Sequence, residues 1–304
     1  MNKLGRLLTA MVTPFDAEGE VDYRQAKNLA RLLLDSGSDG LVVSGTTGEC
    51  PTLSHEEKLR LFAEIKSATG NRGAVVAGTG NYNTRESQQL TKEAEEIGVD
   101  ACLLVVPYYN RPTQQGLFQH FKSIAQATTL PCIIYNVPSR TVTNITADTV
   151  LKLSQIDNIV GIKEASSDLG QIAEIIRGTK DSFLVYSGND SDTLPIIALG
   201  GYGVISVASH LVGIQIADMI NRFLDGKVRE AASIHHHLWP LVTALFVVPN
   251  PVPIKYALNC LGVSVGKPRP PLMEPDAKSA EVIRTTLRNY KIDLPIPSKT
   301  SEKG

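Results

Sequence analysis

The sequence has no excess of positive charge. Its 304 residues include 30 Lys and Arg against 31 Asp and Glu, which leaves a formal net charge of −1. Proteins that bind nucleic acid need clustered positive charge to contact phosphate groups, so we expect no nucleic acid partner. The sequence also lacks any run of roughly 20 apolar residues that could cross a bilayer, and its N-terminus lacks the pattern of a signal peptide. We therefore expect no membrane association.

Paired cysteines are missing as well. The four cysteines, Cys50, Cys102, Cys132 and Cys260, are scattered and form no Cys-x-x-Cys motif. Cys102 and Cys132 lie within apolar runs, where the simplest interpretation is a small buried hydrophobic residue. This usage of cysteine favours a reduced, cytoplasmic compartment.

The sequence does contain a regular series of short apolar runs rich in β-forming residues. They lie about 20 to 35 residues apart, which is the length of a βα unit, and amphipathic helical patterns separate them. The runs are LLTAMVTPF, GLVVSGTTG, AVVAGTGN, ACLLVVPYY, CIIYNVP, NIVGIKEA, FLVYSGND and GVISVAS. Two of the helical patterns begin with capping signals, Asp22-x-x-Gln25 and Ser54-x-x-Glu57. Strands that are apolar on both faces and alternate with helices indicate a parallel sheet covered by helices.

Eight such units predict an α/β fold, the closed (β/α)8 TIM barrel. A doubly wound open sheet is the alternative, but Gly78-Thr79-Gly80 lacks the third glycine of its dinucleotide-binding motif. About eighty residues without strand patterns follow the eighth run, and their helical periodicity predicts a C-terminal helical addition. We expect a catalytic barrel over residues 1–224, a helical region over 225–292 and a loose tail over 293–304.

The chemistry of a barrel lies where its strands end. Residues at those positions here are Thr46, Thr47, Tyr108, Tyr109, Tyr135, Lys163, Gly188 and Ile205. Gly161 and Lys163 share one face of their strand; if that face is the barrel interior, burial lowers the pKa of the lysine. A neutral amine condenses with a ketone to a Schiff base, so the pattern favours class I aldolase chemistry, which needs no metal or cofactor.

Five stretches at the strand ends carry a resemblance to a known family. They are GTTGE (45–49), PYYNRP (107–112), YNVPSRT (135–141), GIKEA (161–165) and GVISV (203–207). With these stretches in order, the chain resembles the dihydrodipicolinate synthase / N-acetylneuraminate lyase family of pyruvate-dependent barrel aldolases. The resemblance implies that Lys163 forms the Schiff base with pyruvate and that Tyr135 shuttles protons.

The same resemblance implies roles for the other residues at the strand ends. Thr46 would link Tyr135 to Tyr109 in a hydroxyl relay, with Tyr109 supplied by a neighbouring subunit of a homotetramer, a dimer of dimers. Thr47 would hold the pyruvate carboxylate. Gly188 and the Ile205 carbonyl would line the pyruvate pocket.

Two residues indicate which branch of the family the chain resembles. Members that cleave sialic acid usually carry serine in place of Thr46 and lack Arg140. An arginine fork suits a second substrate with a carboxylate. The predicted reaction is therefore a lyase-class condensation of pyruvate with L-aspartate-4-semialdehyde to 4-hydroxy-tetrahydrodipicolinate, on the diaminopimelate route to lysine. Two alternatives are a related lyase acting on sialic acid or a keto-deoxy sugar acid, and a non-catalytic barrel that binds a ketoacid.

Some members of the family are inhibited by lysine at a subunit interface. The corresponding residues here are Cys50, Pro51, His55, Lys58, Tyr82, Glu86 and Tyr108. Lys58 stands where sensitive relatives carry a histidine or an acid, and Tyr82 replaces an asparagine that holds the carboxylate of the ligand. We therefore expect weak or absent feedback inhibition.

Three other sequence features could be read as functional sites, but we expect them to have structural roles. His235, His236 and His237 are consecutive, and successive residues on a helix point in different directions, so they predict no metal site. Glu164 should face away from Lys163. Lys255 is a second amine, but it does not lie at a strand end.

Overall fold

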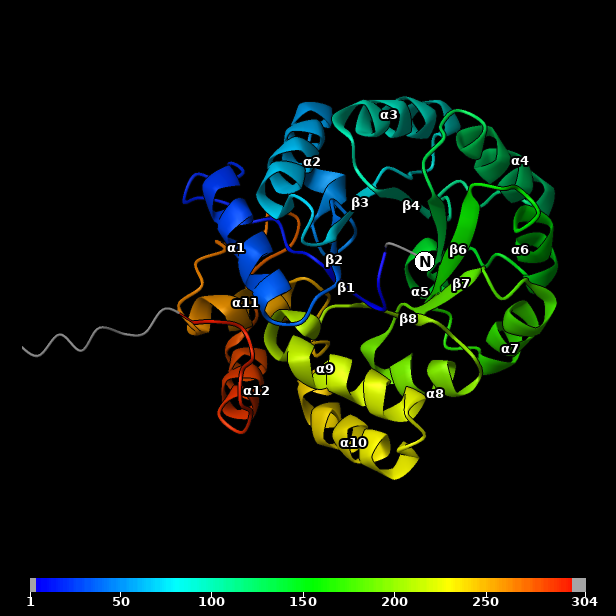
Figure 1. Cartoon of the computed structure of the whole chain (residues 1–304). Helices are drawn as coiled ribbons and strands as arrows, with labels where there is room; N and C mark the ends of the chain where they lie inside the picture. Colours follow the sequence, from blue (N-terminus) through cyan, green and yellow to red (C-terminus); the bar gives the residue numbers. More distant parts are fainter. Residues whose placement is uncertain (1–3, 297–304) are drawn as a thin grey trace, which may run out of the picture.

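Eight parallel strands close into one barrel in the computed structural model, which describes residues 4–296. Each strand pairs with its neighbours in sequence, and β8 pairs with β1, so the predicted (β/α)8 barrel is confirmed and the open-sheet alternative is wrong. Figure 1 shows the strands at the centre with helices around them. The strands are β1 (Leu7–Ala10), β2 (Gly40–Val43), β3 (Ala74–Gly78), β4 (Ala101–Val105), β5 (Cys132–Asn136), β6 (Ile159–Glu164), β7 (Leu184–Ser187) and β8 (Gly203–Ser206).

Helices cover the outside of the barrel and extend it at the C-terminus. They are α1 (Tyr23–Asp35), α2 (His55–Thr69), α3 (Thr84–Ile97), α4 (Gln114–Ala125), the short α5 (Pro138–Thr141), α6 (Ala147–Leu153), α7 (Leu169–Gly178), α8 (Thr193–Ala198), α9 (Ser209–Leu224), α10 (Val228–Ala244), α11 (Val252–Cys260) and α12 (Ala277–Leu287). Asp22 caps α1 by accepting from the Gln25 amide at 2.9 Å, and Ser54 and Glu57 form the predicted capping box of α2.

The barrel encloses a packed core of its own, separate from the layer between strands and helices. Alternate residues of the strands, such as Leu8, Leu103 and Ile133, form the inner cluster. The outer cluster joins the other faces of the strands to the helices. Cys102 and Cys132 belong to this outer cluster and are fully buried free thiols, as predicted. Helix packing on every outer face explains why the strands read as continuous apolar runs.

The C-terminal helices lie on one side of the barrel. In Figure 1, α10 runs beside α9, and α12 packs against α10 and α11. The expected boundary at residues 224 and 225 falls between the end of α9 and the start of α10. The segment after α12 is anchored further than expected: the Asp293 amide donates to the Leu211 carbonyl at 2.7 Å, and Leu294 is buried. The expected start of a loose tail at residue 293 is therefore too early, and residues 297–304 lie outside the described residues.

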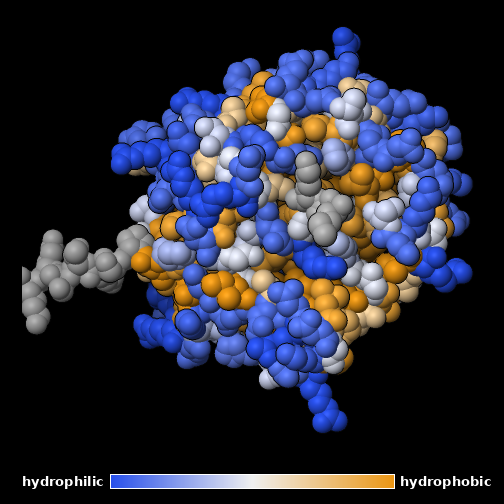
Figure 2. All heavy atoms as spheres, in the orientation of Figure 1, coloured by the Kyte–Doolittle hydropathy of each residue, from blue (hydrophilic) through white to orange (hydrophobic). Residues whose placement is uncertain are grey.

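The surface of the described chain mixes polar and apolar residues. Figure 2 shows hydrophilic and hydrophobic residues interspersed on the face seen in Figure 1. Among the helices of residues 4–296, none combines the length and apolar character that a membrane span requires.

Candidate active site

Lys163 lies inside the barrel near the end of β6. It stands opposite Tyr135 of β5 and Tyr186 of β7 in the strand register, and only 6% of it is exposed. The predicted inward direction of its side chain is therefore confirmed. Its Nζ lies 4.2 Å from the centroid of the Tyr135 ring and forms no hydrogen bond with any residue that the structure describes.

The surroundings of Lys163 favour the neutral amine. Burial lowers the pKa of Lys163 to about 8; the Asp190 carboxylate opposes this shift, and the Arg140 guanidinium adds to it. Asp190 is itself buried, and its carboxylate accepts from the Ser206 hydroxyl and from the backbone amide of Val207 at 3.0 Å. The amine is thus available as a nucleophile at mildly alkaline pH.

Tyr135 lies beside this amine and carries a hydroxyl group. Burial raises the pKa of Tyr135 to about 12, although Arg140 and the Thr46 side chain act in the opposite direction. Tyr135 therefore keeps its proton at neutral pH. Thr46 therefore lies near Tyr135, but no hydrogen bond joins their hydroxyls among the described residues, so the first link of the relay stays a prediction.

The second link of the relay is not made within one chain. Tyr109 is 93% exposed, with φ at +69°. Its hydroxyl bonds to none of residues 4–296. The structure of a single chain thus brings Tyr135, Thr46 and Lys163 together and leaves Tyr109 projecting from the surface.

The ends of β7 and β8 complete the wall around the lysine stem. A Cβ on Gly188 would lie 2.7 Å from the Ala165 Cβ and 3.2 Å from the Lys163 Cε, so only glycine leaves this space open. Ile205 is buried in the inner cluster of the barrel. Gly188 thereby leaves room beside the Lys163 stem.

The loop after β2 is held by residues from distant parts of the chain. Thr47 is buried, and its Oγ1 accepts a hydrogen bond from the Asn250 Nδ2 at 2.9 Å. Arg140 lies on the short helix α5, and its Nη2 donates to the Asn250 carbonyl at 3.2 Å. Arg140 is exposed but influences both Lys163 and Tyr135, which places it at the mouth of the site.

A buried ionic network fixes Glu49, which closely follows Thr46 and Thr47 in the loop after β2. The Lys255 Nζ donates to the Glu49 Oε1 at 2.8 Å, to the Thr13 carbonyl at 3.0 Å and to the Lys267 carbonyl at 3.0 Å. Burial lowers the pKa of Lys255 to about 8, opposed by Glu49. All three of its N–H donors are engaged, so the second buried amine is a structural group.

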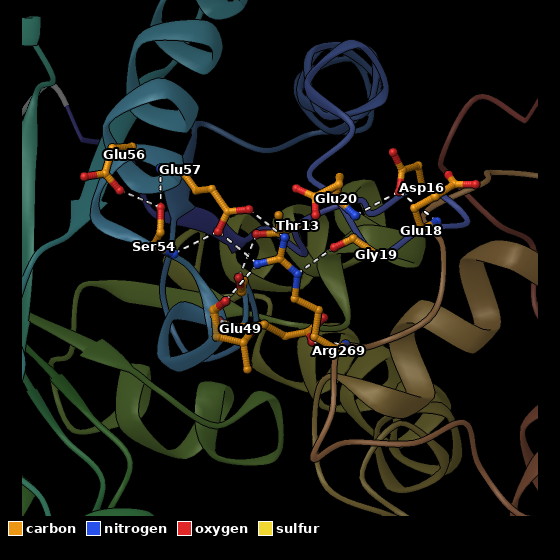
Figure 3. A network of polar contacts seen from close by, with 12 residues as sticks. Thr13, Asp16, Glu18, Gly19, Glu20, Glu49, Ser54, Glu56, Glu57 and Arg269 are labelled. Atoms are coloured by element: carbon orange, nitrogen blue, oxygen red, sulfur yellow. Dashed lines mark hydrogen bonds and ion pairs between the residues drawn. The ribbon is translucent and has the colours of Figure 1, made fainter.

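Arg269 extends this network to α2 and to the loop after β1. Its guanidinium donates to both carboxylate oxygens of Glu57, at 2.9 and 2.6 Å, and to the Gly19 carbonyl at 2.7 Å. Its backbone amide donates to the Glu49 Oε2 at 2.8 Å. Figure 3 shows Arg269 lying between Glu57, Glu49 and Gly19. The C-terminal region thereby holds the segment that carries Thr46 and Thr47.

Most residues of the expected lysine site lie together. The rings of Tyr82 and Tyr108 meet edge to face, with centroids 5.0 Å apart. Burial raises the pKa of Tyr108 to about 12, with further contributions from Cys50, Tyr82 and Glu86. Burial also raises the pKa of the Cys50 thiol to about 11, and the positive charge of Lys58 opposes this shift.

The remaining two members of the expected lysine site lie at its edge. Pro51 is exposed next to Cys50. His55 turns toward α3 and pairs with Glu93 at 2.8 Å.

The other sequence features take structural positions. Within residues 4–296 no three His, Cys, Asp or Glu side chains are arranged to hold a metal ion. Glu164 points away from Lys163: it accepts from the Asn136 Nδ2 at 2.9 Å and from the Gln171 Nε2 at 3.2 Å. This confirms its predicted direction.

Two residues of the site were missed by sequence reasoning. Asp190 follows Gly188 by two positions in SGND, so its place at a strand end was a usable signal. Asn250 lies 203 residues from Thr47 along the chain, and no local pattern indicates that contact.

Comparisons with known proteins agree with this geometry. Residues 3–290 match the model of the dihydrodipicolinate synthetase family. The 4-hydroxy-tetrahydrodipicolinate synthase of Dehalococcoides mccartyi is 64% identical over 296 residues, covering 97% of this chain and 100% of that protein.

Solved structures of similar proteins have the same fold. Dihydrodipicolinate synthase from Bacillus anthracis superimposes with a TM-score of 0.94 at 45% identity, covering 96% of this chain and 100% of that one. The enzyme from Cyanidioschyzon merolae, solved with lysine bound, gives a TM-score of 0.94 at 46% identity, covering 95% and 99% of the two chains.

Proposed function

The chain belongs to the dihydrodipicolinate synthetase family, and we propose that it carries out the reaction of that family through a covalent imine on Lys163. The enzyme condenses pyruvate with L-aspartate-4-semialdehyde to 4-hydroxy-tetrahydrodipicolinate, on the diaminopimelate route to lysine. This is the predicted condensation rather than cleavage of a sugar acid. The observation that carries the proposal is a buried amine of lowered pKa, free of hydrogen bonds within the described chain, beside a protonated tyrosine.

The covalent steps need one amine and a proton carrier. The neutral Nζ of Lys163 attacks the keto carbon of pyruvate, and loss of water gives an iminium. The iminium withdraws electrons, so the methyl carbon loses a proton and an enamine forms. The enamine carbon then attacks the aldehyde carbon of the second substrate, and the amine of the product displaces Lys163 as the ring closes. The iminium serves as the electron sink, and we propose that no metal or cofactor takes part.

Tyr135 is proposed to move the protons in these steps. Its hydroxyl is protonated at neutral pH, which suits it to donate to the oxygen that leaves as water. A phenol of such high pKa is a weak base alone, so the proton must pass onward when Tyr135 accepts one. Thr46 lies close enough to lower the pKa of Tyr135, and we propose that it takes up this proton and that Tyr109 of a neighbouring subunit continues the relay.

The remaining residues of the site are proposed to hold the two substrates. The Thr47 hydroxyl contacts the pyruvate carboxylate, while Gly188 and the Ile205 carbonyl line the pocket beside Lys163. Arg140, at the mouth, binds the carboxylate of the semialdehyde through its planar pair of N–H donors. Its position near both Lys163 and Tyr135 supports this role, because the aldehyde must reach the enamine.

The exposed Tyr109 supports a proposed assembly of at least two subunits. A tyrosine that is 93% exposed gives no catalysis to its own chain, and a neighbour would bury it. We propose a dimer of dimers in the cytoplasm, where the four free cysteines remain thiols. Sedimentation of a fully active monomer would contradict the role of Tyr109.

Variants of the two cationic residues test the proposed roles. Lys163→Arg keeps a positive charge but cannot form an imine, so both turnover and trapping of pyruvate by borohydride should disappear. Arg140→Ala should raise the KM for L-aspartate-4-semialdehyde while the final extent of pyruvate trapping stays unchanged. If Arg140→Ala impaired the use of L-aspartate-4-semialdehyde and the trapping of pyruvate equally, Arg140 would have a structural role instead of binding the semialdehyde. Arg31→Ala, an exposed change on α1, is the matched control and should alter neither.

A further inference from the structure

Asn250 connects the C-terminal region to both proposed substrate positions. It precedes α11 and is only 6% exposed. Its side-chain Nδ2 donates to the Thr47 Oγ1 at 2.9 Å, and its carbonyl accepts from Arg140 at 3.2 Å. Its side-chain Oδ1 is buried and has no hydrogen-bond partner among the residues that the structure describes. Asn250 thus contacts both Thr47, which is proposed to bind the pyruvate carboxylate, and Arg140, which is proposed to bind the semialdehyde carboxylate.

The contact with Thr47 fixes the direction of the threonine proton. A hydroxyl group has one proton to donate, and an amide nitrogen can only donate. Because Asn250 Nδ2 donates to Thr47, the Thr47 oxygen is the acceptor of this bond and its own proton is left for another acceptor. A carboxylate is such an acceptor. Asn250 therefore prepares Thr47 to donate to the keto acid.

The Oδ1 atom lies within the same residue as the carbonyl that holds Arg140. A buried acceptor without a partner costs free energy, so the site favours a ligand that brings a donor. The carboxylate that Arg140 is proposed to bind belongs to L-aspartate-4-semialdehyde. In this α-amino acid the ammonium group is on the carbon next to that carboxylate. Because Arg140 also donates to the Asn250 carbonyl, we infer that this ammonium group is the donor for the Asn250 Oδ1.

We propose that Asn250 is a substrate-binding residue whose Oδ1 accepts from the α-ammonium group of the aldehyde substrate while its Nδ2 orients Thr47. This inference rests on the proposed roles of Thr47 and Arg140 and adds a determinant of specificity to them. It predicts that the site distinguishes an amino acid aldehyde from an aldehyde acid without an amino group.

Two variants of similar size separate the two contacts. Asn250→Leu removes both polar groups, and Asn250→Asp keeps the acceptor but replaces the donor. The first measurement compares the KM for L-aspartate-4-semialdehyde with the competitive inhibition constant of succinate semialdehyde, which lacks the amino group. In Asn250→Leu the KM should rise about 10- to 100-fold, the usual effect of losing a hydrogen bond to a charged group. The inhibition constant should change by less than about threefold.

The second measurement uses pyruvate alone. In Asn250→Asp the Thr47 proton turns toward the new carboxylate, so the pyruvate concentration for half-maximal borohydride trapping should rise at least about tenfold. Asn250→Leu leaves the Thr47 proton free and should change this value much less. Asn221→Asp, the same change at an exposed position of α9, should alter neither measurement, and thermal melting checks that each variant is folded.

The outcomes separate this inference from the proposed function. Equal increases of the KM and the inhibition constant in Asn250→Leu would overturn the ammonium contact, because a purely structural role affects both ligands. Unchanged trapping in Asn250→Asp would overturn the orientation of Thr47. Absence of trapping on Lys163 in the unaltered enzyme would instead refute the proposed function.

Discussion

Imine formation on Lys163 should follow a pH profile set by burial. With the pKa lowered from 10.5 to about 8, about one amine in 11 is neutral at pH 7, compared with about one in 3,000 for an ordinary lysine. Burial thus increases the reactive fraction about 300-fold. The rate of imine formation at low pyruvate should rise about tenfold from pH 7 to pH 9 and level off above it. Tyr135 keeps its proton throughout this range because its pKa is about 12.

Rapid mixing with pyruvate, followed by borohydride and measurement of the intact protein mass, gives this rate at each pH. Arg140 lowers the pKa of Lys163 and Asp190 raises it. Arg140→Ala should therefore move the midpoint of the profile to higher pH, and Asp190→Asn should move it to lower pH. A rate that keeps rising about tenfold per pH unit through pH 9.5 would refute the reasoning, because it would show an amine with the ordinary pKa.

Three further predictions concern catalysis, stability and regulation. Tyr135→Phe should lower kcat by about 10²–10⁴, the usual effect of losing a positioned acid–base group, as measured by initial rates. Lys255→Met should reduce the free energy of unfolding by about 3–5 kcal/mol, because Glu49 is left buried and charged. The double variant Lys255→Met/Glu49→Gln should recover part of this loss in thermal melting. If it recovers none, the charge of Glu49 is not the cause of the loss. L-lysine should give no half-inhibition below about 1 mM at low pyruvate, because the ammonium group of Lys58 repels that of the ligand. Two ammonium groups about 4 Å apart repel by about 1 kcal/mol in water and about 4 kcal/mol at an effective dielectric of 20. Stronger inhibition would show that Lys58 does not oppose the ligand.

The features that could be predicted from the sequence depend on local periodicity. Each strand and each capping signal lies within a few residues, and the alternation of faces along a strand was enough to turn Lys163 inward and Glu164 outward. The places of Thr46 and Thr47 followed because the ends of parallel strands meet at one face of a barrel.

The features that could not be predicted depend on contacts between distant segments. Asn250 contacts Thr47 across 203 residues, and Lys255 contacts Glu49 across 206. The sequence set Lys255 aside only because it does not lie at a strand end. Its three hydrogen bonds, which Lys163 lacks within the described chain, could not be predicted from the neighbouring residues. Tyr109 is exposed and its hydroxyl bonds to none of residues 4–296, so the position of Tyr109 in the relay stays a prediction.

Peptide mapping of the borohydride-treated enzyme tests the proposed chemistry most directly. The enzyme is incubated with pyruvate, reduced and digested, and each lysine-containing peptide is examined by mass spectrometry. The imine mechanism predicts a reduced pyruvate adduct on the peptide that contains Lys163, with loss of activity in proportion to the modification. An adduct on Lys255, whose N–H donors are all engaged, or an active enzyme without any adduct on Lys163, would contradict it.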